Sequence, residues 1–444
     1  MKRLVLTAFA AGALAIGLAA ATQADNASKT FRRFDKLVDV FERVRAEYVE
    51  PVDEDKLIEA AISGMLSSLD PHSSYMPPDS FRAMQVQTDG EFGGLGIEVQ
   101  MENGLVKVVS PIDDTPAARA GIEGGDLIIQ IDGEQVYGLS LQEALDKMRG
   151  PVGAPITVTI LREGKDEPFD VTIVRDMIKL RAVRARVEDG SVGYVRISTF
   201  NRQASDGLEE AVADLRKQLD GRMTGLILDL RGNPGGLLDQ AVGVADAFLD
   251  HGEIVSTRGR RKADIDRRAA RPGDVIDGLP LIVLVNAYSA SASEIVAGAL
   301  QDHRRAVVLG TQTFGKGTVQ TVIPLAGEAA MRLTTARYYT PSGRSIQEYG
   351  IKPDIEVKQP RPAGAEEEDE TPSSPRREAD LRNHLSNEHS PAGQTNLEVK
   401  DAPLAPREVV PTSVDTEDAK DYQLGYALSL MRGIAQQKAQ LALN

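Results

Sequence analysis

The residues of this chain that could carry out covalent chemistry are three closely spaced serines and a lysine further along. Ser289, Ser291 and Ser293 alternate with alanines just before Glu294, and Lys316 follows downstream between two glycines. The chain has no cysteine, which excludes thiolate chemistry, and none of its five histidines stands beside a serine or aspartate in a triad-like motif. A serine nucleophile with a lysine base is therefore the most economical way for this chain to cleave a peptide.

Ser291 has two compatible interpretations. Its spacing to Glu294 is that of a capping box, so it could simply cap the helix that follows. The same position, directly after a buried strand and a short turn, places a hydroxyl where backbone N–H groups and the helix dipole favour developing negative charge. A capping role alone would not require the Gly-Lys-Gly loop downstream. The neighbouring serines leave the choice of nucleophile open on physical grounds.

Lys316 can act as a base only if its amine is neutral. Its pKa must then fall from about 10.4 to about 7–8, which corresponds to about 4 kcal/mol of lost solvation. Burial in an apolar site can supply a change of that size. If Lys316 begins a strand, Gln320 shares its face by period-two alternation and could orient the amine without adding a charge. A carboxylate in that place would raise the lysine pKa instead.

The segment around Lys316 also comes close to a phosphate-binding motif. Gly310 to Lys316 has the G-x-x-x-x-G-K spacing, but Gly317 stands where a magnesium-binding Ser or Thr is needed, and a strand pattern follows rather than a helix. The net charge of -15 argues against nucleic acid as a partner, because phosphate binding needs a basic surface. We therefore expect no nucleotide at this loop and no nucleic-acid partner.

The turn Asn233-Pro-Gly-Gly236 follows another buried strand. In the simplest interpretation it is a strand-to-helix turn in which a glycine takes a positive φ. In the functional interpretation, Gly235 or Gly236 supplies one backbone N–H of an oxyanion hole and Ala292 supplies the other. Such donors are worth about 3–4 kcal/mol in the rate step.

The elements that must position these residues alternate along the chain. From Gly193 to about Val357, buried apolar strands such as residues 225–230 and 281–285 alternate with helical segments. This order predicts an α/β (α+β) core over residues 176–360, with a parallel or mixed sheet and crossover connections. An arginine-rich insert, Arg258 to Arg271, is expected to be a mobile surface loop.

Residues 91–175 show a different pattern, with short strands, two helices and glycine-containing turns. The motifs between Ser110 and Gly133 resemble those of a PDZ domain. In that family a loop before the second strand turns backbone N–H groups toward the C-terminal carboxylate of a peptide, which then adds to the sheet as an extra strand. The resemblance implies this role for Gly94, Leu95, Gly96 and Ile97.

The N-terminus has the features of an export signal. Lys2-Arg3 is followed by an apolar run, Leu4 to Ala21, and by small residues, which predicts a signal peptide over residues 1–24. An uncleaved membrane anchor is the alternative, although the many Ala and Gly residues make the run weakly hydrophobic. In both cases we expect export to the periplasm, with the inner membrane as a candidate site of association. Residues 25–90 are predicted to form a helical segment, in which His72 is interpreted as a surface or capping residue.

The composition changes twice in the C-terminal part. Residues 361–417 are rich in Pro, Ser and Glu, with 13 acidic against 6 basic residues, and are expected to form a disordered acidic linker. Residues 418–444 predict an amphipathic helix with Leu424, Leu428 and Met431 along one face. This stripe must be buried either on the protein's own core or against a second copy of the chain.

In combination, the motifs from Phe31 to Val357 resemble those of the carboxyl-terminal processing peptidases, also called tail-specific proteases. The resemblance implies a crotonase-like protease core with an inserted PDZ domain, and it implies neither metal nor cofactor. It selects Ser291 as the nucleophile, Lys316 as the base and Gln320 as the support of the lysine. The matching stretches are Leu69 to Tyr75, the PDZ-like unit, Asp229 to Gly236, Ser289 to Gly298, Phe314 to Gly317 and Tyr339 to Arg344.

The expected function is that of an exported serine endopeptidase that binds C-terminal tails through its PDZ domain and cleaves through an acyl-enzyme. Candidate partners are protein or peptide C-terminal tails, a second copy of the chain bound through the C-terminal helix, and an activator in the envelope. The alternative, from another functional class, is a catalytically silent PDZ scaffold that recruits partners to the envelope.

Overall fold

The computed structural model describes residues 33–165, 167–359, 376–388, 407–409 and 421–442. The predicted signal peptide therefore lies outside the described residues. The chain divides into two units, Met1–Leu69 and Asp70–Asn444. In the first unit, a helix over residues 33–47 is followed by α2 (Glu54–Ser67), which begins at the capping side chain of Asp53. None of the described helices combines the length and the apolar character that a membrane span requires.

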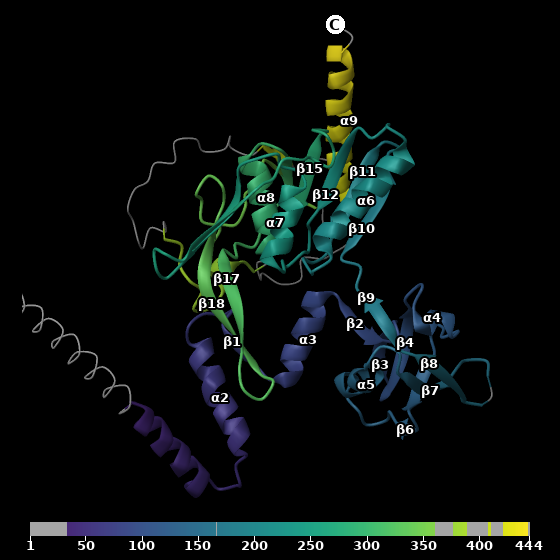
Figure 1. The fold of residues 1–444 in the computed structure, drawn as a ribbon, viewed down its shortest axis with the longest axis vertical. Coiled ribbons are helices and arrows are strands. Elements are labelled where there is room, and N and C mark those ends of the chain that lie inside the picture. Colours follow the sequence, from purple (N-terminus) through teal and green to yellow (C-terminus); the bar gives the residue numbers. More distant parts are fainter. Residues whose placement is uncertain (1–32, 166, 360–375, 389–406, 410–420, 443–444) are drawn as a thin grey trace, which may run out of the picture. The chain divides into compact units, whose positions relative to one another are not determined.

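Within the described part of the second unit, a seven-stranded sheet forms the centre of the α/β core (Figure 1). Its order is β10-β11-β12-β15-β16-β19-β20, and the β10–β11 pair is antiparallel whereas the other pairs are parallel. Helices α6, α7 and α8 lie in the connections between successive parallel strands, so the predicted mixed sheet with crossover connections is confirmed. The strands are β10 (Val183–Glu188), β11 (Val192–Ile197), β12 (Gly225–Asp229), β15 (Leu281–Val285), β16 (Val307–Gly310), β19 (Ile355–Val357) and β20 (Arg407–Val409), and the helices are α6 (Ala204–Leu219), α7 (Leu238–Asp246) and α8 (Ala292–Asp302).

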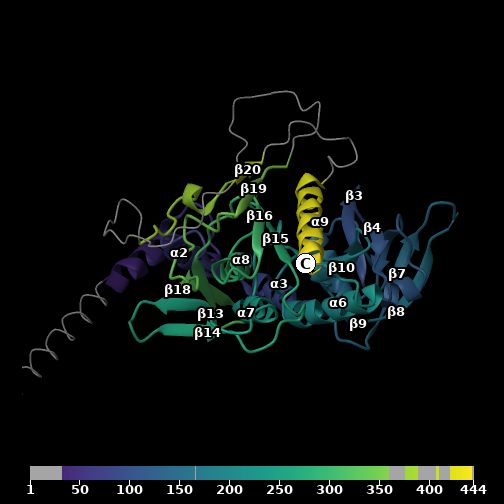
Figure 2. The same ribbon diagram turned by 90° about the horizontal axis from the view of Figure 1, so that it is seen from above.

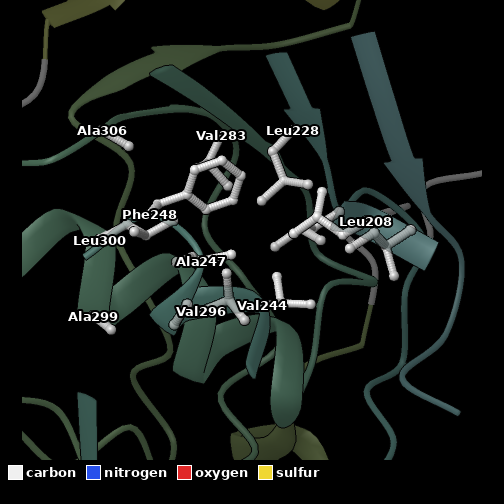
Figure 3. Close-up of a cluster of buried hydrophobic side chains, with 14 of the residues drawn as sticks. Leu208, Leu228, Val244, Ala247, Phe248, Val283, Val296, Ala299, Leu300 and Ala306 are labelled. Atoms are coloured by element: carbon white, nitrogen blue, oxygen red, sulfur yellow. The ribbon is translucent and has the colours of Figure 1, made fainter. Parts of the chain in front are cut away.

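Both faces of this sheet are covered, because its strands send alternate apolar side chains to opposite sides. On one face, Leu228 and Val283 pack with Phe248 and with residues of α6, α7 and α8, as Figure 3 shows. On the other face, Ile227 and Leu284 pack against α9 (Tyr422–Ala442), which lies on the side of the sheet away from α7 and α8 (Figure 2).

The C-terminal helix α9 thus docks on the protein's own core. Its apolar stripe, which includes Leu428 and Met431, is buried there. A Cβ added to Gly225 of β12 would lie 2.3 Å from the Met431 sulfur, which shows how close this packing is. Asp421 pairs with Arg231 at 2.6 Å and anchors the start of the helix. Because this apolar stripe is buried within the chain, it does not need a second copy of the chain to cover it.

A second sheet, of five strands among the described residues, has the order β1-β18-β13-β14, with β17 paired to β18. The arginine-rich insert belongs to this sheet as the β13–β14 hairpin, so the expectation of a mobile loop is wrong. Four of its arginines are paired with acids, for example Arg261 with Asp264 and Arg267 with Glu253, which a count of basic residues alone does not reveal. The strands are β1 (Ser74–Met76), β13 (Glu253–Gly259), β14 (Ile265–Ala269), β17 (Thr318–Pro324) and β18 (Ala330–Tyr339).

The PDZ-like unit is inserted between α3 (Pro78–Asp89) and the α/β core. It has a sheet of order β3-β4-β5-β7-β8, with β6 paired to β5, around a core that includes Ile128 and Val158. Within the described residues β3 pairs with β4 alone, so its outer edge is open. The elements are β2 (Glu91–Gly94), β3 (Ile97–Glu102), β4 (Leu105–Pro111), α4 (Pro116–Arg119), β5 (Leu127–Ile131), β6 (Glu134–Gln135), α5 (Leu141–Met148), β7 (Pro155–Leu161), β8 (Phe169–Val174) and β9 (Asp176–Lys179), which pairs with β2.

The acidic linker is ordered in two places. Residues 376–388 contain a 3-10 turn, η1 (Glu378–Asp380), and residues 407–409 form β20 beside β19. The expectation of disorder is wrong for residues 376–388. The average composition of the linker does not reveal that two of its polar side chains, Glu378 and Asn387, are buried. The rest of 361–417 lies outside the described residues.

Candidate active site

The turn between β15 and α8 singles out Ser291 among the three serines. The hydroxyls of the two neighbouring serines are hydrogen-bonded to backbone carbonyls. Ser289 Oγ donates to Leu230 O and Ser293 Oγ donates to Asn233 O, each at 2.9 Å. Ser291 is 7% exposed and has φ 56° and ψ -112°. A non-glycine residue with positive φ is uncommon and carries strain, which is typical of functional sites.

The Ser291 side chain faces a residue that the sequence did not single out. Tyr338, on β18, lies close enough for the Ser291 hydroxyl to act on its pKa, which this hydroxyl lowers. Burial raises the pKa of Tyr338 to about 12, so its phenol keeps its proton at neutral pH. No motif marks this tyrosine, because β18 and the start of α8 are far apart in the sequence.

Lys316 lies in the loop between β16 and β17. Burial lowers the pKa of its amine, while Glu378 acts to raise it and Arg332 acts to lower it further. Among the described residues, Lys316 Nζ makes no hydrogen bond and no ion pair, and in particular none with Ser291 Oγ. The lysine therefore has the sheltered environment that a neutral amine needs, without a carboxylate bonded to it.

One buried carboxylate ties the serine turn to the lysine loop. Glu294 is 0% exposed, and its Oε2 accepts the backbone N–H groups of Ser291 at 2.7 Å and Lys316 at 2.9 Å. Its Oε1 accepts the Thr313 hydroxyl and the Gly315 N–H, both at 2.6 Å. Burial raises the pKa of Glu294 to about 7, although these hydrogen bonds act in the opposite direction. The sequence indicated Glu294 only as the capping partner of Ser291. Its hydrogen bonds to the lysine loop were not predicted, because a capping box involves only residues three positions apart.

The glycine turn before α7 packs against Ser291. A Cβ added to Gly235 would lie 2.9 Å from the Ser291 Cβ. The Gly235 N–H donates to Asn233 Oδ1 at 2.9 Å, so the expectation that Gly235 donates to an oxyanion is wrong. The N–H groups of Gly236 and Ala292 have no hydrogen-bond acceptor in the described part of the chain. These two donors remain available for an oxyanion.

In the structure as described, Gln320 makes no hydrogen bond to Lys316. Its amide donates to the hydroxyls of Thr318 at 2.9 Å and Thr334 at 3.3 Å. The prediction of a shared face fails because β17 begins at Thr318, so Lys316 precedes the strand and strand alternation does not extend to it. A β-bulge between Val319 and Gln320 disturbs the register further.

The Leu69–Tyr75 stretch lies at the same site. Asp70 accepts hydrogen bonds from the Ser73 hydroxyl at 2.7 Å and from Thr334 at 3.1 Å. His72 is neither a surface nor a capping residue, since its Nε2 contacts the buried carboxylate of Glu378 at 2.8 Å. The partner lies 306 positions away, which no local pattern could reveal. In the described residues no group of three or more His, Cys, Asp or Glu side chains is arranged to hold a metal ion.

The glycine loop of the PDZ-like unit is shaped for backbone recognition. Leu95 is buried, and Gly96 has φ 79°, which favours glycine. The carbonyls of Leu95 and Gly96 accept the N–H groups of Ala117 and Ile112, each at 2.9 Å. Among the described residues, no acceptor faces the N–H groups of Leu95 and Gly96. They lie between Gly94, which ends β2, and Ile97, which begins the open-edged β3.

Three family models match the chain. The model of peptidase family S41 matches residues 191–357, the PDZ domain model matches residues 93–173, and the model of the activating protease CtpB N-terminal domain matches residues 13–80.

Whole-chain relatives agree with these matches. The carboxy-terminal-processing protease of Bartonella bacilliformis is 52% identical over 94% of this chain and 92% of its own length. The carboxy-terminal processing protease CtpB of Bacillus subtilis is 37% identical over 77% of this chain and 71% of its own length. Among solved structures, a photosystem II D1 C-terminal processing protease is similar at 30% identity, with a TM-score of 0.42, over 72% of this chain and 92% of its own. With its S41 core and its PDZ domain, this chain belongs to the carboxy-terminal processing proteases of peptidase family S41.

Proposed function

We propose that this protein is an exported serine endopeptidase that captures the C-terminal tail of a protein substrate through its PDZ domain and cleaves it by a Ser291/Lys316 dyad. The observation that carries the proposal is the Glu294 carboxylate, which holds the backbone of the serine turn and the backbone of the lysine loop together. The amine of Lys316 is buried and no carboxylate is bonded to it, and both features support Lys316 as the base.

In the proposed reaction, the neutral amine of Lys316 accepts the proton of the Ser291 hydroxyl while Oγ attacks the carbonyl carbon of the scissile peptide. The N–H groups of Gly236 and Ala292 stabilise the oxyanion of the tetrahedral intermediate. The ammonium of Lys316 then gives its proton to the departing amine, which leaves an acyl-enzyme on Ser291. Water, deprotonated by Lys316, attacks the ester, and the carboxylic acid product leaves as the proton returns to Oγ.

Substrate capture would use the PDZ loop and the edge of β3. The N–H groups of Leu95 and Gly96 would bind the terminal carboxylate, and the preceding residues of the tail would pair with the open edge of β3. Removing the carboxylate should therefore weaken binding. A tail peptide with an amidated C-terminus should bind less tightly than its free-acid form in a fluorescence anisotropy titration.

Export rests on residues 1–24, whose charged start, apolar run and small residues support a signal for the periplasm. Fractionation of cells that produce the full chain tests this, with a variant lacking residues 1–24 as the control. If the full chain and the variant are both recovered in the cytoplasmic fraction, the proposal of export is wrong. Inner-membrane association and an envelope activator are tested with the same fractions, by detergent release and by recovery of activity when membranes are added back.

Cleavage of tail peptides separates the protease from the alternative of a silent PDZ scaffold. We expect turnover by the wild type and its loss in Ser291→Ala and Lys316→Ala. Mass spectrometry of the quenched wild-type reaction should detect the acyl-enzyme on Ser291. Equal turnover in all three proteins would remove the dyad, and turnover in none of them would favour the scaffold.

A further inference from the structure

Residues 376–388 form a segment that is held on the protease core by polar contacts. Glu378 is 0% exposed and Asn387 is 4% exposed, whereas the other side chains of this segment are exposed or half-buried. Docked segments usually bury apolar side chains, because a buried carboxylate costs free energy unless hydrogen bonds compensate for it. Arg337 also donates to Ser386 O at 2.7 Å and His384 contacts Glu348 at 2.8 Å, so the buried Glu378 is one of several polar contacts that hold this segment.

Glu378 joins two parts of the active site that are distant in sequence. Its two carboxylate oxygens lie 2.8 and 3.0 Å from His72 Nε2, and one of them also accepts Gln347 Nε2 at 3.0 Å. Its backbone N–H donates to Phe314 O at 3.0 Å. Phe314 lies two residues before Lys316, so the segment holds the lysine loop from one side.

Gln347 extends this hold to the other side of Lys316. Its Oε1 accepts the Gly317 N–H at 2.9 Å, while its Nε2 donates to Glu378 and to Leu385 O. Its backbone carbonyl accepts Asn387 Nδ2 at 2.6 Å. The segment thus fixes the lysine loop at a residue before Lys316 and, through Gln347, at the residue after it.

The same carboxylate also acts on the charge of Lys316. After burial, which lowers the pKa of Lys316, Glu378 is the largest influence and raises it. The other charged groups that face the amine are Arg332, which lowers its pKa, and Glu294 and Asp70, which raise it. Glu378 would also favour the ammonium that forms when Lys316 takes the serine proton, as the aspartate of a catalytic triad does for its histidine.

We propose that residues 376–388 of the linker are a part of the active centre, in which Glu378 is a positioning residue for the loop that carries Lys316. The inference rests on the proposed role of Lys316 as the base. It assigns a function to a segment of the acidic linker, which shares no motif with the family pattern used above. The linker then does more than connect the core to α9, because part of it completes the surroundings of the base.

Four variants in the full-length protein test this. Glu378→Ala should lower kcat at least tenfold and change KM little, and Glu378→Asp should recover part of the loss. Glu378→Gln should lower kcat and move the acid limb of the pH profile of kcat/KM to lower pH, because the influence that raises the Lys316 pKa is lost. Glu209→Gln, which removes an exposed carboxylate from α6 outside this segment, should leave both unchanged.

Thermal unfolding of each variant separates a local effect from loss of the fold. If Glu378→Ala unfolds, the near-isosteric Glu378→Gln decides. Unchanged kcat and an unchanged pH profile in Glu378→Gln would overturn the inference, and so would faster turnover, which would make the segment an inhibitory cap. If Ser291→Ala and Lys316→Ala are inactive while Glu378→Gln matches the wild type, this inference fails and the proposed function stands. If Lys316→Ala retains full turnover, the proposed function fails as well.

A second experiment supplies the segment from outside. Residues 376–388 are replaced by a Gly/Ser linker of equal length, and a synthetic peptide of the same residues is added. Recovery of kcat with this peptide, and not with one carrying Glu378→Gln, supports the inference. No recovery at a peptide concentration that saturates binding by fluorescence anisotropy, or no binding at all, counts against it.

Discussion

Replacing Glu294 by glutamine tests whether one buried carboxylate holds the two halves of the active site together. Each oxygen accepts two hydrogen bonds, one pair from the backbone of Ser291 and Lys316 and the other from Thr313 and Gly315. Glutamine places an NH2 group where one oxygen was. The Thr313 hydroxyl can turn away from it, but a backbone N–H cannot.

The size of the effect follows from this geometry. In its better orientation, the glutamine leaves the Gly315 N–H facing another donor, and in its worse orientation it orphans both Ser291 N–H and Lys316 N–H. One buried donor without a partner costs about 1–3 kcal/mol, and the bonds that remain lose their charge assistance. If the lysine loop shifts to relieve this cost, kcat/KM should fall by about 10- to 100-fold, since about 1.4 kcal/mol corresponds to a factor of ten.

Steady-state cleavage of a tail peptide, with thermal unfolding measured in parallel, checks this prediction. Glu209→Gln removes an exposed carboxylate from α6 and should behave like the wild type. A Glu294→Gln protein with wild-type kcat/KM and wild-type Tm would refute the argument. A lower Tm with full turnover would show that the carboxylate supports the fold and not the site.

Three further predictions concern the glycine turn, the amine of Lys316 and the C-terminal helix. Gly235→Ala should lower kcat/KM at least 100-fold in peptide cleavage without loss of folding by circular dichroism, because its Cβ would lie 2.9 Å from the Ser291 Cβ; wild-type activity would contradict the packing. The kcat/KM of the wild type should rise with pH and level off below 10.5, because burial lowers the pKa of Lys316 and the neutral amine is the active form; a profile that falls over this range would exclude a lysine base. Met431→Ala should lower the free energy of unfolding by about 2–4 kcal/mol in urea titrations, and an unchanged value would mean that α9 is not docked in solution.

The local parts of this molecule could be predicted from the sequence. The buried strands β12 and β15 are continuous apolar runs, and each is followed by a turn with small residues and a helix. Such patterns depend on neighbours within a few positions, so the core, the turn at Ser291 and the lysine loop all follow from them. The choice among three serines did not, because the carbonyls that engage Ser289 and Ser293 come from another strand connection.

The prediction that Gln320 supports Lys316 shows a second limit of what the sequence can predict. Gln320 was expected beside Lys316 because strand alternation was extended through residues that precede the strand. The start of β17 is set by its pairing with β18, where Thr318 lies opposite Arg337. A strand boundary fixed by a distant partner cannot be found from local periodicity, and strand alternation says nothing about residues that precede the strand.

The acids around Lys316 show why its chemistry needs the whole fold. A carboxylate bonded to the amine would keep it protonated, yet Glu378, Glu294 and Asp70 all act on its pKa. Each of them is engaged elsewhere: Glu378 by the side chains of His72 and Gln347, Glu294 by four donors of the two active-site loops, and Asp70 by Ser73 and Thr334. Because other donors occupy these carboxylates, the negative charge stays near the amine without an ion pair to it. In the proposed reaction, such an amine can lose its proton before the attack and still be stabilised once it has taken the proton of Ser291.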